Sequence, residues 1–129
     1  MADSFLDAAR RHRSDARHLA TDRRHQNGGH LIGFAAECLA KDILTNAGIL
    51  IDKKSSFREH FPTLGEQIRT NARTRGMVAL IPIIRSAAFL AGWSASSRYE
   101  VGLPPAEAEA RYVSWSADVN ALFSAAGLP

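Results

Sequence analysis

One segment, residues 30–44, constrains the fold more than any other part of the chain. It reads HLIGFAAECLAKDIL, and its apolar side chains recur every three or four residues on almost every face of a helix. A helix of this kind has to be enclosed by neighbouring elements. One carboxylate, Glu37, stands in its centre, and an unpaired buried charge would cost several kcal/mol. The sequence therefore predicts a central helix that supplies a polar partner or a route to water for Glu37.

A second long helix is expected before the central one. It would be capped by Asp3 or Ser4 and run to about Arg24, where the sequence QNGG at 26–29 would end it. The central helix would then begin near His30 and stop at Ala47-Gly48, since glycine suits the left-handed position after a helix. Two long helices joined by so short a connection predict an antiparallel hairpin.

Three further helices are expected in the second half of the chain. Thr63-Leu-Gly-Glu66 has the form of a capping box, which marks a helix start. Residues 77–91 are apolar enough for a strand, but Pro82 and the helical spacing of the apolar residues predict a helix that is kinked or started near Pro82. Pro104-Pro105 would open the last helix. The expected fold class is all-α, an up-and-down bundle of about five helices.

Length and composition predict a single domain over residues 1–129. A chain of 129 residues can bury a core of its own, and its one cysteine, Cys38, rules out a disulfide within the chain and suits a reducing cytoplasm. The longest apolar run, residues 77–84, is too short to span a membrane, so we expect a cytoplasmic protein. The segment 10–25 carries six arginines against two aspartates. It could meet phosphates or form a solvated outer face.

Residues 92–105 lack helical periodicity but are rich in chemical groups. Five side chains there could hold a phosphate, because hydroxyl and guanidinium groups are its usual donors: Ser94, Ser96, Ser97, Arg98 and Tyr99. The alternative is a turn whose serines bond to nearby backbone groups. Trp93 and Tyr99 could likewise stack on a base or anchor the core.

Two partners for Glu37 follow from the sequence. Lys41 stands at the i, i+4 position and could form a helix-surface ion pair. Arg98 could instead meet Glu37 across the bundle, and the carboxylate would then orient the guanidinium toward an anionic ligand. The five histidines do not have the spacing of metal ligands, so no metal and no cofactor are expected.

This order of helices resembles the HEPN domain family. The resemblance rests on His30 to Lys41, which is similar to the family's second helix, on His60-Phe-Pro-Thr-Leu64 at a helix start, and on Trp93 to Tyr99 before the last helix. It implies a helical bundle that usually forms homodimers, with a polar cleft near the dimer axis. Many bacterial members are metal-independent ribonucleases of toxin–antitoxin and defence systems. Others bind nucleotides or act as partners of nucleotidyltransferases.

The nuclease members of that family carry an Arg followed four to six residues later by a His. Arg98 matches the Arg, but Leu103, Pro104 and Pro105 stand where the His would follow. Cleavage of RNA needs one group to take the 2′-hydroxyl proton and another to stabilise the charged phosphate, and Arg98 could do only the second. Tyr99 would be a poor base at neutral pH.

The expected function is therefore non-catalytic binding of a nucleotide or of an RNA phosphate by a HEPN-like module. Six residues would contribute: Arg98, Ser97, Tyr99, Ser94, Glu37 and Lys41. One alternative is an active endoribonuclease toxin that uses Arg98 with a His from elsewhere in the dimer. Another is a protein-interaction subunit whose partner is an antitoxin or a nucleotidyltransferase.

Overall fold

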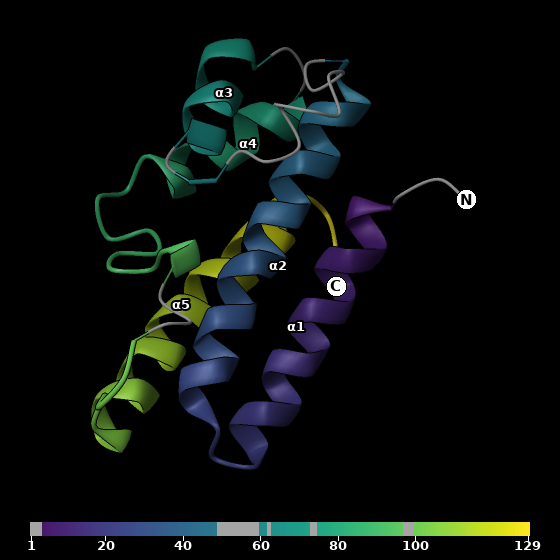
Figure 1. Ribbon diagram of the computed structural model, residues 1–129. Helices are drawn as coiled ribbons and strands as arrows, with labels where there is room; N and C mark the ends of the chain where they lie inside the picture. Colours follow the sequence, from purple (N-terminus) through teal and green to yellow (C-terminus); the bar gives the residue numbers. More distant parts are fainter. Residues whose placement is uncertain (1–3, 49–59, 62, 73–74, 97–99) are drawn as a thin grey trace.

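A computed structural model describes residues 4–48, 60–61, 63–72, 75–96 and 100–129 of the chain. These residues form five helices and no strand, which confirms the all-α fold class: α1 (Phe5–Thr21), α2 (His25–Asn46), α3 (Thr63–Asn71), α4 (Arg75–Ile84) and α5 (Pro105–Ala125). The long helices α1, α2 and α5 lie beside one another, and α3 and α4 stand at one end of α2 (Figure 1).

The expected hairpin of α1 and α2 is present, but its turn lies earlier than predicted. α1 is capped by Ser4, whose side chain accepts a hydrogen bond from the Asp7 amide, and it ends at Thr21. The chain then reverses through residues 22–24, where Arg23 takes a φ of 61°. Because α2 already begins at His25, residues 26–29 belong to its first turns. The prediction that QNGG ends the first helix is therefore wrong.

Close packing explains why two glycines occur inside α2 at this point. A Cβ atom on Gly28 would lie 3.2 Å from the carbonyl oxygen of Ala16, and one on Gly29 would lie 3.0 Å from the Trp115 ring. Both distances are at or below the limit of ordinary contacts. Gly28 and Gly29 thus let α1 and α5 approach α2, whereas Gly48 with its φ of 76° follows the end of the helix as expected.

The α3–α4 region corrects two further boundaries. Pro82 lies inside α4, which is a helix as predicted, but the helix begins before Pro82 and ends at Ile84. Residues beyond Ile84 form turns instead of the expected continuation to residue 91. The capping box is also absent from the described contacts, because Thr63 is already helical and the Glu66 carboxylate accepts from Arg69 at 2.6 Å.

The core is built around α2, as the apolar pattern predicts. This helix contributes the largest buried set, which comprises Ile32, Ala35, Ala36, Leu39, Ala40 and Leu44. Leu64 and Ile68 of α3 and Val119, Leu122 and Phe123 of α5 pack into the same core. Each of the five helices is therefore held by its own apolar side chains against α2 or its neighbours.

Part of the basic segment in α1 is used to attach α5. The guanidinium of Arg13 lies 3.8 Å from the centre of the Phe123 ring, and Arg17 donates to the Asn120 side chain at 3.2 Å. Arg10 and Arg11 of the same helix are exposed. None of the helices in the described residues is long and apolar enough to cross a membrane.

Candidate functional site

Glu37 finds its partner at the start of α3. The carboxylate is buried, with 1% of the side chain exposed, and its two oxygens lie 2.8 and 3.1 Å from Nδ1 of His60. The backbone amide of Phe61 donates to the same carboxylate at 3.1 Å. His60 is a partner that the helical pattern around Glu37 did not indicate. No ion pair joins Glu37 to Lys41 in the described structure, and Arg98 lies outside the described residues.

The fold brings the two residues together through the first turn of α3. Glu37 stands in the middle of α2, on the side that packs against α3, and the carbonyl of His60 accepts a hydrogen bond from Leu64 at 3.1 Å. Leu64 is itself fully buried. The buried carboxylate therefore anchors both the side chain of His60 and the backbone that leads into α3.

This arrangement determines the chemistry that His60 can perform. When Glu37 is ionised its carboxylate can only accept, and in that state Nδ1 of His60 donates and Nε2 is the acceptor of the neutral ring. The side chain of His60 is 50% exposed, so a ligand can reach the imidazole. A histidine held in one tautomer by a carboxylate is the arrangement that general acid–base catalysis uses.

Lys41 lies one helical turn from Glu37, and Cys38 follows Glu37 directly in α2. Lys41 is buried at 9% exposure, and its charge lowers the pKa of the Cys38 thiol, but burial has the larger effect and raises that pKa overall. The thiol therefore stays protonated at neutral pH, as expected for a small residue packed against the core.

The predicted phosphate-binding loop is described only in part. Ser97, Arg98 and Tyr99 lie outside the described residues, so their proposed roles stay predictions. Ser94 is exposed, and its hydroxyl lies 2.8 Å from that of Ser96, a contact between two side chains.

Trp93 serves as a core anchor in the described structure. Its indole nitrogen donates to the carbonyl of His30 at 3.2 Å, and its ring meets Phe34 edge-on at 5.4 Å between centroids. A Cβ atom on Gly33 would lie only 1.9 Å from the indole ring. The missing side chain of Gly33 therefore leaves the space in which the Trp93 ring packs against α2.

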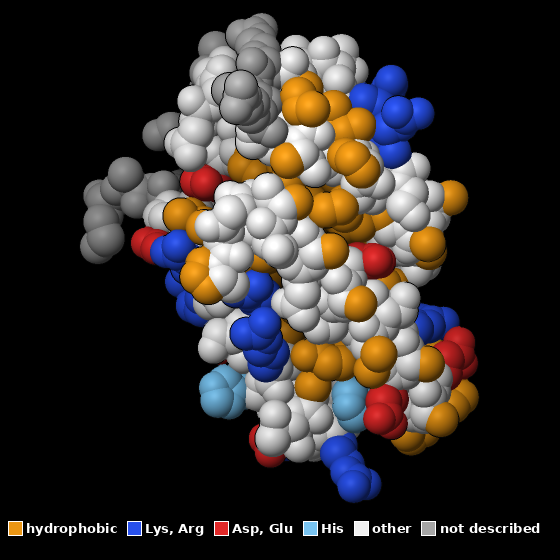
Figure 2. All heavy atoms as spheres, turned by 180° about the vertical axis from the view of Figure 1, so that it is seen from behind, with side chains coloured by type: hydrophobic (Ala, Val, Ile, Leu, Met, Phe, Trp, Pro, Cys, Tyr) orange, Lys and Arg blue, Asp and Glu red, His pale blue; other side chains and the backbone are white. Residues whose placement is uncertain are grey.

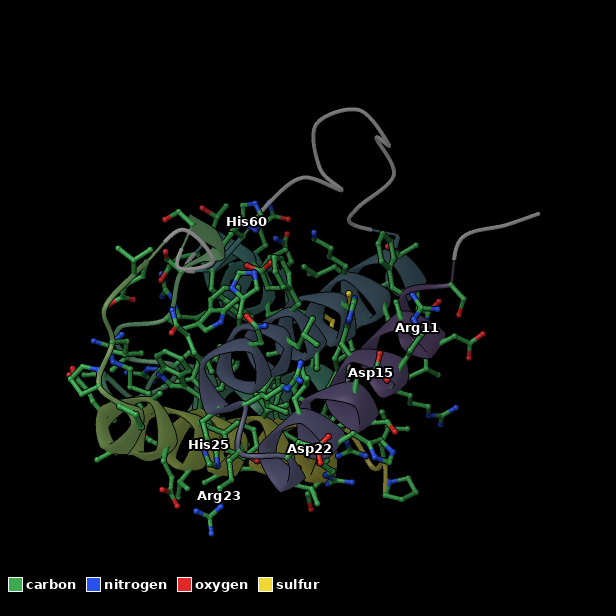
Figure 3. The ribbon with its side chains drawn as sticks, turned by 60° about the horizontal axis from the view of Figure 1, so that its bottom comes forward. Arg11, Asp15, Asp22, Arg23, His25 and His60 are labelled. Carbon is green, nitrogen blue, oxygen red and sulfur yellow. The ribbon has the colours of Figure 1, made fainter. Side chains whose placement is uncertain are left out.

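The charged row on α1 forms a separate surface. Figure 3 shows His60 apart from the other labelled side chains, which are Arg11 and Asp15 on α1, Asp22 and Arg23 in the turn that follows it, and His25 at the start of α2. No group of three His, Cys, Asp or Glu side chains within the described ranges is placed to hold a metal ion.

No family model, curated protein or solved structure matches this chain. The resemblance to the HEPN family consequently stays a prediction from the residues named above. The all-α helical bundle agrees with it at the level of fold class.

Proposed function

We propose that the chain is a HEPN-like helical module that binds a phosphate group of a nucleotide or of RNA, and that Glu37 and His60 form part of its site. The observation that carries this proposal is the buried carboxylate bonded to a half-exposed imidazole. When protonated, His60 can donate from Nε2 to a phosphate oxygen while Glu37 balances its charge. Arg98, Ser97 and Tyr99 would complete the set of donors.

The same proposal includes the setting that the family resemblance implies. The module would act in the cytoplasm as a homodimer, and Ser94 and Lys41 would lie close enough to the bound phosphate to contribute to the site. A homodimer would also place two such sites near one axis, which suits a ligand with several phosphates such as RNA.

The Glu37–His60 pair also favours a second function, that of a metal-independent endoribonuclease. Here His60 would replace the histidine that is missing after Arg98. Its Nε2 would take the proton of the 2′-hydroxyl, and the hydroxyl oxygen would attack the adjacent phosphorus and displace the 5′-oxygen of the next nucleotide. Arg98 would stabilise the charge that develops on the phosphate. The departing 5′-oxygen would take a proton from water and His60 would lose its proton to water, so the products would be a 2′,3′-cyclic phosphate and a free 5′-hydroxyl.

Replacing His60 with alanine should weaken binding of ATP or of a short oligoribonucleotide by roughly 10- to 100-fold, the effect of losing one charge-assisted hydrogen bond. Isothermal titration calorimetry at one fixed salt concentration measures the change. His18→Ala is the matched control, because His18 is an exposed histidine on α1. Equal affinities of the wild type and His60→Ala would contradict the assignment of His60 to the site.

The nuclease is tested with the same oligoribonucleotide in the presence of EDTA. We expect His60→Ala to abolish the release of cyclic-phosphate product, and a substrate with a 2′-deoxy substitution at the cleaved position to resist the wild type. If the wild type binds the oligoribonucleotide without cleaving it, the nuclease function is excluded and the binding function is retained. If neither RNA nor nucleotide binds, the function as a protein-interaction subunit for an antitoxin or a nucleotidyltransferase is left.

A further inference from the structure

A cavity of about 560 Å³ opens between α3, the end of α4 and the turns that follow α4. This volume is within the range of roughly 300–1,000 Å³ that small-molecule sites occupy. Seen from behind, hydrophobic side chains gather over the α3–α4 end of the molecule, and basic groups lie at its edge (Figure 2). The walls of the cavity contain neither His60 nor Glu37, but Phe61, whose amide donates to Glu37, lines it, so the cavity adjoins the site proposed above without sharing its ligand-binding side chains.

The wall formed by the turns is held in place from two sides. Asp118 of α5 accepts from the amide of Leu90 at 2.8 Å, and Leu90 takes a φ of 49° there. The indole nitrogen of Trp115 donates to the carbonyl of Ala91 at 2.8 Å, while Trp93 is bonded to α2. These contacts keep the wall in position without a ligand, so binding would not have to order it.

Aromatic rings supply part of the apolar lining, beside Ile84, Ala87 and Leu90. Phe61 at the start of α3 and Phe89 in the turns meet edge to face at 5.5 Å between centroids, and Trp93 adds a third ring. Rings arranged in this way favour a flat aromatic partner, which can stack on one ring and meet the edge of another.

The charges of the lining favour an anion. Arg69, Arg85 and Glu66 all line the cavity, which gives one net positive charge from two cations and one anion. Arg69 is paired with Glu66 at 2.6 Å, and this hydrogen bond lowers the pKa of the Glu66 carboxyl. Within the described part of the chain, the side chain of Arg85 has no hydrogen-bond or ion-pair partner. Its guanidinium is therefore free to bind a carboxylate or a phosphate in a bidentate manner.

We propose that this cavity binds a small organic anion with a flat aromatic body, whose carboxylate or phosphate group is held by Arg85. The site goes beyond the proposed function, because it uses different residues and requires neither RNA nor His60. Glu66 limits the affinity of the cavity for the anion, because its ion pair with Arg69 keeps that guanidinium from the ligand.

The proposal is tested with three probes that share one aromatic body: 1-naphthoate, 1-naphthyl phosphate and the neutral 1-naphthamide. Calorimetry gives the affinities, and the indole N–H signal of Trp93 in an NMR titration reports the place of binding. We expect both anions, or the one whose head group fits, to bind at least about 5-fold more tightly than the amide. Comparison of the two anions shows whether the site takes a carboxylate or a phosphate.

Variants of the lining test the role of each charge. Arg85→Gln should weaken binding of the preferred anion by roughly 10-fold, the effect of losing one charge-assisted contact at an exposed position. Glu66→Gln should tighten it, because it releases Arg69. Arg10→Gln and Glu109→Gln are matched controls, since they change the net charge equally at exposed positions on α1 and α5. Thermal unfolding confirms that each variant is folded.

Three results would overturn the proposal. The first is that neither anion binds at millimolar concentration. The second is that the neutral amide binds as tightly as the anions, which would leave Arg85 without a role. The third is that Arg85→Gln is folded and binds the preferred anion with unchanged affinity.

Discussion

Replacing Gly33 with alanine should destabilise the protein by about 2 kcal/mol, although alanine is the better helix former. The added Cβ would lie 1.9 Å from Cε2 and 2.1 Å from Nε1 of Trp93, far inside van der Waals contact. Overpacking of this kind costs roughly 3 kcal/mol, and the higher helix propensity of alanine returns about 1. The indole cannot simply turn away, because it is bonded to the His30 carbonyl and packed on Phe34. Urea unfolding measures the loss.

Gly65→Ala is the control for this experiment. Gly65 also lies within a helix, but a Cβ atom there would meet Phe61 at 3.6 Å and Ile84 at 3.9 Å, which are ordinary contacts. We expect this change to be neutral or stabilising by up to about 1 kcal/mol. In a Trp93→Ala background, Gly33→Ala should lose most of its cost. Equal stability of Gly33→Ala and the wild type would show that the Trp93 ring does not pack against Gly33.

Replacing Glu37 with alanine should cost about 3 kcal/mol of stability. The change removes the acceptor of His60 Nδ1 and of the Phe61 amide, and it leaves a cavity in the middle of α2. Glu37→Gln should cost less, because its amide oxygen can still accept from Phe61. Denaturant unfolding gives the free energies, and hydrogen exchange at Leu64 reports whether the start of α3 loosens.

Two comparisons identify the cause of that loss. Glu109→Ala on the exposed face of α5 should change stability little. His60→Ala leaves the Glu37 charge buried with one donor fewer, so the double variant should be more stable than the sum of the two single effects predicts. Additive losses would show that the two side chains are not coupled, and would remove the basis for placing them in one site.

Local patterns of the chain determined the helices and the place of α2 among them. The spacing of Ile32, Leu39 and Leu44 is enough to predict a helix enclosed by others, because the periodicity is a property of the segment itself. Pro104-Pro105 likewise marked the start of α5 through their fixed φ angles and missing amide hydrogens. The five helices of the described residues follow from such local signals.

Contacts between distant segments determined the helix boundaries that the local sequence patterns did not predict. Gly28 and Gly29 have the sequence of a helix end, and only the closeness of Ala16 and Trp115 shows why they lie inside a helix.

The partner of Glu37 illustrates the same limit at the candidate site. The sequence predicted Lys41 as a partner by helical spacing and Arg98 as a partner across the bundle, while His60, 23 residues from Glu37, belonged only to the residues that mark a helix start. Periodicity describes which face of a helix a residue occupies, but it contains no information on which residue of another helix will meet it. The packing of α3 against α2 decided that pairing, because it placed the Phe61 amide and the His60 imidazole over a carboxylate that burial required to be bonded.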